Sequence, residues 1–145
     1  MEDCINEWKQ LLQSKPKRHI AFAEPFDLRV LKAATALAEE QLLTPVLLGN
    51  QDDIIHFAKE NNVTMDDCTY IDPAKQTMIQ NEATTIADVN LLGTLLVKTG
   101  KVDGLLTGAV YATKDAIRPA LQHIPLKREN SRISGVMVVS TSERR

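Results

Sequence analysis

Apolar residues recur along the chain in two periods, separated by turn residues. Spacings of about three to four residues, as in Ile5, Trp8 and Leu12, are typical of amphipathic helices. Short apolar runs closed by glycine or proline are typical of buried strands. Helices are predicted at residues 3–14, 28–41, 51–61, 75–99 and 114–123. Strands are predicted at residues 19–24, 44–49, 69–72, 102–109 and 133–140.

Residues with known preferences for helix ends support these boundaries. Pro16 follows the first helix and stops it, because proline has no N–H and its ring clashes with the preceding turn. Asp27 stands where a helix N-cap accepts backbone N–H bonds. Gly100 is placed to cap the C-terminus of the fourth helix. Thr113 is predicted to cap the last helix in the same way as Asp27.

Strands and helices alternate five times along the chain. Buried-type strands separated by amphipathic helices are typical of right-handed crossovers between parallel strands. The predicted fold class is therefore α/β, a three-layer αβα sandwich with a mainly parallel sheet. The length of 145 residues suits a single α/β domain over residues 1–145. The last predicted strand runs directly into TSERR with no helix to cover it, so we expect a longer protein of which this is one part.

Composition excludes several classes of protein. The chain is 43% hydrophobic and 25% charged, as in globular proteins, and its formal net charge of −2 gives no general attraction to nucleic acid or to a membrane. No apolar run approaches the ~20 residues that a membrane span needs. Cys4 and Cys68 lie far apart, outside any metal-ligand spacing, and the N-terminus is unlike a signal peptide. We expect a cytoplasmic protein.

Candidate chemistry gathers just after the fourth predicted strand, in DGLLTGAVYATKDAIRPALQ (103–122). In open parallel sheets, ligands bind outside the carboxyl ends of the strands. Gly108 permits a close approach of the backbone, and the helix that begins near Thr113 offers free N–H groups to an anion. Lys114 and Arg118 add positive charge, and a guanidinium can grip a phosphate bidentately. The alternative is a stable surface helix without a ligand.

Other candidates are weaker. Glu24, Asp27 and Arg29 lie at the end of the first predicted strand and belong to the same rim if the sheet is parallel. Asp27 is more suited to a helix cap than to acid catalysis. Tyr111 could stack on a ligand base. The signatures GxGxxG, GxxxxGK[ST], GxSxG and HExxH do not occur. The histidines are scattered without a metal-binding spacing: His19, His56 and His123.

Four segments together resemble the phosphate acetyltransferase (phosphotransacetylase) family, in the same order along the chain. They are AEPFDLRVLKAA (23–34), PVLLGN (45–50), the stretch 103–122 with its RPALQ, and SRISGVMVV (131–139). The resemblance implies an enzyme that transfers an acetyl group between coenzyme A and inorganic phosphate, with no metal or other cofactor and with coenzyme A as a substrate. It also implies two α/β domains, a homodimer, and about twice the present length, so that this chain is the amino-terminal part.

The resemblance also implies roles for particular residues. Arg118, in the RPALQ segment, is similar to a substrate-binding arginine, and Thr113 and Gly108 correspond to residues that line the cleft. The family's catalytic serine, arginine and aspartate belong to the other half, so no catalytic residue is expected in this chain, which alone should be inactive. This sequence departs from the family at Tyr111-Ala112, which replace a His-Ser pair, and at Lys114. It also lacks a basic segment before the long helix.

Three alternatives remain open at this point. A phosphate butyryltransferase is built on the same pattern, although the RPALQ segment favours acetyl transfer. A further alternative is the acyltransferase-like domain appended to malic enzymes. From a different class, the chain could be a non-catalytic module that binds coenzyme A or a phosphorylated metabolite.

Overall fold

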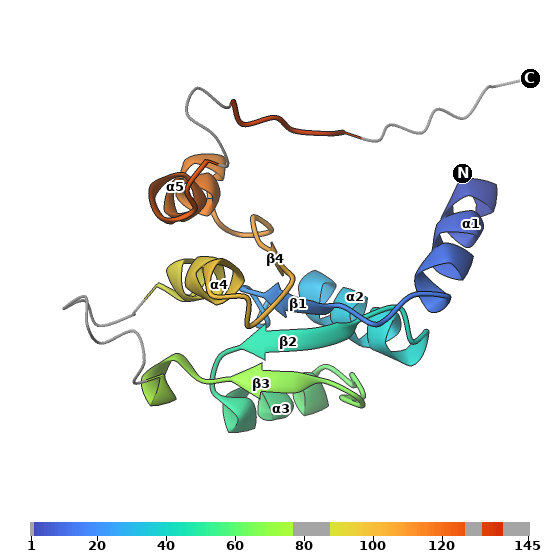
Figure 1. The fold of residues 1–145 in the computed structure, drawn as a ribbon. Coiled ribbons are helices and arrows are strands. Elements are labelled where there is room, and N and C mark those ends of the chain that lie inside the picture. Colours follow the sequence, from blue (N-terminus) through green and yellow to red (C-terminus); the bar gives the residue numbers. More distant parts are fainter. Residues whose placement is uncertain (1, 77–87, 127–131, 138–145) are drawn as a thin grey trace, which may run out of the picture.

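The computed structural model describes residues 2–76, 88–126 and 132–137 and shows an α/β fold (Figure 1). In chain order the elements are α1 (Glu2–Gln13), β1 (His19–Phe22), α2 (Leu28–Glu39), β2 (Thr44–Leu48), α3 (Gln51–Glu60), β3 (Thr69–Ile71), the 3-10 turn η1 (Pro73–Lys75), α4 (Val89–Lys98), β4 (Gly104–Leu106) and α5 (Thr113–His123). Within the described ranges, no helix is long and apolar enough to cross a membrane.

The four strands form one parallel sheet in the order β3-β2-β1-β4. β1 lies in the centre, with Phe22 level with Leu47 of β2 on one side and with Leu106 of β4 on the other. β2 and then β3 are added on one side of β1, and β4 is added on the other side. The predicted fold class is thus confirmed.

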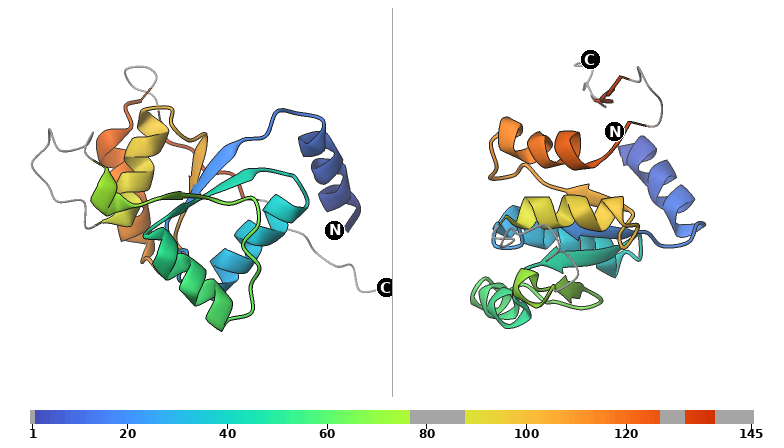
Figure 2. Two further views of the ribbon diagram at one scale, coloured as in Figure 1. Left: turned by 90° about the horizontal axis from the view of Figure 1, so that it is seen from below. Right: turned by 60° about the vertical axis from the view of Figure 1, so that its left-hand side comes forward.

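Helices cover both faces of the sheet, and side chains alternate between the two cores with the period of two expected of strands. Phe22 and Leu47 point to the face covered by α2 and α3, where they meet Leu31 and Ile54. Ala21, Val46 and Leu48 point to the other face, under α4. α5 packs against α4 rather than on the strands, as Figure 2 shows.

Two of the predicted caps are confirmed. The Asp27 side chain accepts a hydrogen bond from the Arg29 N–H at the start of α2. Gly100 follows the last residues of α4 with φ +71°, a left-handed conformation that glycine adopts without a steric penalty. Gly93, in the middle of α4, allows the helix to approach the sheet, because a β-carbon there would lie 2.5 Å from Leu105 Cδ1.

The predicted continuous helix over 75–99 is wrong. Gln76 and Asp88 both have extended backbone angles, so η1 ends before the first and α4 begins after the second. Residues 77–87 lie outside the described part. The Asp88 carboxylate accepts a hydrogen bond from the Asn90 N–H and thereby caps α4, which explains why the helix starts there rather than earlier.

The predicted strand over 133–140 is also not formed where it is described. Residues 132–137 have no strand partner, and Val136 and Met137 expose 94% and 85% of their surface. Figure 1 shows this segment running away from the sheet. Residues 138–140 lie outside the described part. A strand pattern alone does not create a strand, because its backbone needs a neighbouring edge to accept its hydrogen bonds.

Candidate functional site

The site lies at the carboxyl ends of β1 and β4, where the chain passes to opposite faces of the sheet. The loop after β1 (23–27) leads to α2 on one face, and the loop after β4 (107–112) leads to α5 beyond the other. Such a switch point leaves a crevice between the two loops, which is where ligands bind in open α/β sheets. Of the three rim residues predicted from the sequence, Glu24 and Arg29 contact the loop before α5, and Asp27 is connected to it through Arg29.

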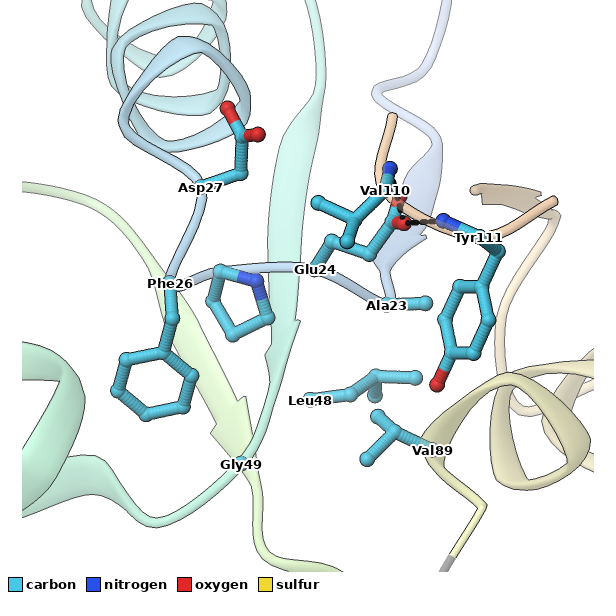
Figure 3. Close-up of a pocket in the computed structure, with 10 residues that line it drawn as sticks. Ala23, Glu24, Phe26, Asp27, Leu48, Gly49, Val89, Val110 and Tyr111 are labelled. Atoms are coloured by element: carbon cyan, nitrogen blue, oxygen red, sulfur yellow. Dashed lines mark hydrogen bonds between the residues drawn. The ribbon is translucent and has the colours of Figure 1, made fainter. Parts of the chain in front are cut away.

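Glu24 joins the two loops. Its Oε2 accepts a hydrogen bond from the Ala109 N–H at 2.8 Å, and its Oε1 accepts from the N–H groups of Val110 and Tyr111 at 2.7 and 2.8 Å. Figure 3 shows the carboxylate pointing at this backbone. Burial to 9% exposure opposes the charge, but these backbone hydrogen bonds outweigh it and lower the pKa of Glu24 below its ordinary value.

Arg29 makes a second link between the loops. Its guanidinium binds both oxygens of Asp27, with Nε–Oδ1 at 3.0 Å and Nη2–Oδ2 at 2.7 Å, and Nη2 also donates to the Ala109 carbonyl at 3.2 Å. The hydrogen bond from the Arg29 side chain is the main reason why the pKa of Asp27 falls to about 2. Asp27 is thus a helix cap and an ion-pair partner, as its position in the sequence suggested.

A cavity of about 560 Å³ opens between the two loops, β2 and the start of α4 (Figure 3). Phe26, Leu48 and Val89 supply apolar walls, while Glu24 and Tyr111 border it on the side of the loop after β4. Gly49, at the end of β2, also lines it. Because Glu24 turns both of its oxygens toward backbone N–H groups, the cavity wall presents mainly apolar surface to a ligand.

Arg118 borders a second, smaller cavity of about 320 Å³ between α4 and α5, together with Asp88 and Tyr111. Its Nη2 lies 3.5 Å from Oδ1 of Asp115, one turn earlier on α5, and 47% of the Arg118 side chain is exposed. Tyr111 lines both cavities, and its hydroxyl donates to Asp88 at 3.4 Å. Burial and the nearby Asp88 carboxylate raise the pKa of the Tyr111 phenol, which keeps it neutral and able to donate.

The predicted cap at Thr113 is wrong. α5 begins at Thr113 itself, and the N-cap position belongs to Ala112, which has no side-chain cap bond. The Ala112 carbonyl already accepts from the N–H groups of Asp115 and Ala116, so Thr113 is one residue too late to cap. Gly108 has φ +100°, where glycine is favoured, and it shapes the turn after β4. Both Gly108 and Thr113 are exposed, and neither lines the two cavities.

Asn90 attaches α5 to α4 at the point where a proline weakens α5. Pro119 has no N–H, so it leaves the carbonyl of Asp115, four residues earlier, without its helical partner. Asn90 is fully buried, and its Nδ2 donates to the carbonyls of Asp115 and Ala116, at 3.0 Å each. This contact holds the helix that carries Arg118 against α4.

Sequence reasoning missed the roles of Glu24 and Asn90. An acid directly after the first strand was the only signal for Glu24, and nothing in the sequence indicated which donors it would meet. No sequence pattern indicated a role for Asn90, because the carbonyls that it binds come within hydrogen-bond distance only when α4 and α5 pack together. Among the described residues, no group of three or more His, Cys, Asp or Glu side chains could hold a metal ion.

Comparison with known proteins places this geometry in a family. The model of a protein family described as "Phosphate acetyl/butaryl transferase" matches residues 3–89 and 74–145, which is almost the whole chain. The chain belongs to this family. The match spans the loop after β1, the loop after β4 and the RPALQ helix with Arg118.

Individual members of the family are similar over most of the chain. The phosphate acetyltransferase of Bacillus subtilis (strain 168) is 34% identical over 160 residues, covering 99% of this chain and 49% of the relative. The phosphate acetyltransferase of Staphylococcus aureus (strain MRSA252) is 36% identical over 153 residues, covering 94% of this chain and 46% of the relative. Both are about twice as long as this chain, which therefore spans about half of the curated relatives that it matches.

Solved structures agree with the fold. A phosphotransacetylase from Streptococcus pyogenes matches with a TM-score of 0.74 and 31% identity, covering 88% of this chain and 45% of that chain. The EutD phosphotransacetylase from Staphylococcus aureus matches with a TM-score of 0.74 and 32% identity, covering 88% and 44%. The family membership expected from the four sequence segments is thus confirmed.

Proposed function

We propose that this chain is the first of two domains of a phosphate acetyltransferase, which moves an acetyl group between coenzyme A and inorganic phosphate. The similarity of nearly the whole chain to phosphate acetyltransferases carries this proposal. The cavity between α4 and α5, which Arg118 borders next to the crevice at the sheet edge, supports it on physical grounds. Relatives named for acetyl transfer favour acetyl over butyryl as the acyl group.

The reaction needs two anionic substrates to meet. A phosphate oxygen attacks the carbonyl carbon of the thioester, the new C–O bond forms, the C–S bond breaks, and the coenzyme A thiolate leaves and takes up a proton. Arg118 would neutralise one of the anions and fix its orientation, which lowers the cost of bringing the two together. Thr113 and Gly108 line neither cavity, so they would contribute through the backbone, Gly108 at the turn after β4 and Thr113 at the start of the helix that carries Arg118. The acid–base group and the oxyanion donors would come from the second domain.

Other properties of the whole protein belong to the same proposal. It would need no metal or bound cofactor, would act in the cytoplasm, and would form a homodimer. A mass measurement in solution on the two-domain protein tests the last point, and a mass equal to one chain would contradict it.

The activity is tested by following free thiol after acetyl-CoA and phosphate are mixed with the two-domain protein. We expect thiol release that depends on phosphate, and none with the 145-residue chain alone. Butyryl-CoA in place of acetyl-CoA should react more slowly. If the two-domain protein binds coenzyme A but releases no thiol, the chain belongs to a binding module rather than an enzyme.

A further inference from the structure

Three consecutive backbone N–H groups, of Ala109, Val110 and Tyr111, converge on one carboxylate. This arrangement is an anion-binding concavity of the kind that backbone amides form in turns. It lies in the stretch where the sequence predicted a cradle for phosphate. In the structure the anion is Glu24 of the same chain, which reaches across from the loop after β1 (Figure 3).

Glu24 is held firmly in this position. Its three hydrogen bonds measure 2.7–2.8 Å, which is short for N–H donors and typical of charge-assisted bonds. Only 9% of the residue is exposed. Arg29 fixes the same loop from its other side by donating to the Ala109 carbonyl. A phosphate that approached these amides would meet a buried carboxylate of like charge, which opposes its binding.

The position of Glu24 matters for the residues that follow. The loop that it holds continues through Ala112 into α5, and Arg118 lies one and a half turns farther along that helix. The same hydrogen bonds place Tyr111 between the two cavities, where its hydroxyl reaches Asp88.

We propose that Glu24 is the resident anion of the amides of residues 109–111 and a positioning residue for the start of α5, so that an external phosphate binds beside Arg118 and not on these amides. The first part stands on the hydrogen bonds alone. The assignment of the external phosphate to Arg118 rests on the proposed function.

The first test is amide hydrogen exchange in the 145-residue chain carrying Glu24→Gln. Glutamine keeps the shape of the side chain, but it replaces one acceptor oxygen by an NH2 donor. It can therefore accept hydrogen bonds from only some of the three N–H groups. We expect the glutamine oxygen to keep accepting hydrogen bonds from the N–H groups of Val110 and Tyr111. Hydrogen exchange at the Ala109 amide should become roughly tenfold to a hundredfold faster. Glu39→Gln, on the exposed face of α2, is the matched control and should leave the exchange rates of all three amides unchanged. Unchanged exchange at all three amides in Glu24→Gln would overturn the proposal.

The second test separates an anion site from a merely structural contact. In Glu24→Ala, added formate should restore protection of the three amides, because a small carboxylate can enter the space left by the side chain. If Glu24→Ala does not fold, the Glu24→Gln pattern decides. A folded Glu24→Ala chain in which formate restores nothing would contradict the resident-anion role.

Inorganic phosphate is the probe for the external anion. In the wild-type chain, phosphate should shift the NMR signal of the Arg118 side chain and leave the amides of residues 109–111 in place. Phosphate shifts at these amides with Glu24 present would overturn the proposal. Failure of the proposed function has a different signature: Arg118 would not respond to phosphate, while the results at Glu24 would stand.

Discussion

The charged side chains in and around the two cavities have partners within the chain before any ligand binds. Asp27 is paired with Arg29, Arg118 with Asp115, and Glu24 with backbone N–H groups. A phosphate that binds Arg118 must therefore compete with a carboxylate of the same helix. The exposed Arg118–Asp115 pair, at 3.5 Å, is the weakest of these contacts.

This competition predicts a gain of affinity on Asp115→Asn. Removing the carboxylate frees the guanidinium and takes away a negative charge near the incoming anion. Because exposed ion pairs contribute about 0–1 kcal/mol, phosphate should bind the 145-residue chain up to about fivefold more tightly, measured by titration of the Arg118 side-chain signal. Asp52→Asn, far away at the start of α3, should leave the affinity unchanged. Weaker binding in Asp115→Asn would contradict the competition.

The Asp27–Arg29 pair predicts a dependence of stability on acid. Since the pKa of Asp27 is lowered from 3.8 to about 2 in the folded state, its contribution is fully present above about pH 4 and is lost as the pH falls toward 2. Asp27→Asn keeps a good N-cap but removes the charge. The difference in free energy of unfolding between wild type and Asp27→Asn, from urea titrations, should therefore be constant above pH 5 and shrink as the pH falls from 4 through 2. A difference that is the same at pH 2 as at pH 5 would contradict the pairing.

At the scale of elements, α5 depends on α4 for a hydrogen bond that its own sequence cannot make. Asn90→Ala should destabilise the chain by about 1–3 kcal/mol, because it leaves the carbonyl of Asp115 without a donor. Pro119→Ala restores an N–H that can bind this carbonyl within the helix. The loss from Asn90→Ala should thus be smaller in the Pro119→Ala background. Additive effects of the two substitutions would show that Asn90 does not compensate for the proline.

In the exposed segment 132–137, an apolar residue should tolerate replacement by a charged one. Val136→Glu should change the free energy of unfolding by less than about 0.5 kcal/mol, because the side chain is 94% exposed. Leu96→Ala, on the buried face of α4, should cost about 2–5 kcal/mol in the same urea titration. A large loss on Val136→Glu would mean that this segment pairs with a strand in solution.

Local chemistry explains which elements the sequence could predict. Asp27 and Gly100 act on backbone groups within their own turn, so their roles were visible from spacing. Thr113 failed as a cap because α5 begins one residue earlier than expected, with Ala112 at the N-cap, and spacing does not fix a helix boundary to a single residue. The strand expected at 133–140 has the right pattern, but its formation depends on an edge that the pattern does not describe. Glu24 needs a partner 85 residues away, which spacing cannot show.

At the scale of the whole molecule, the crevice between the two loops lies at the carboxyl edge of the sheet, beside the cavity that Arg118 borders. Nearly all of the chain matches the family, yet it spans about half of its curated relatives. We therefore propose that this half of the enzyme binds an anion beside Arg118. The other half would supply the groups that transfer protons and stabilise the oxyanion.

The role of Arg118 is tested most directly by the steady-state kinetics of Arg118→Ala in the two-domain protein, compared with Lys32→Ala on the exposed side of α2. Loss of a charge-assisted hydrogen bond should raise the KM for phosphate or coenzyme A about tenfold or more. Lys32→Ala should match wild type. If Arg118→Ala has the same KM values as wild type for both substrates, the cavity beside Arg118 does not bind the substrate anion.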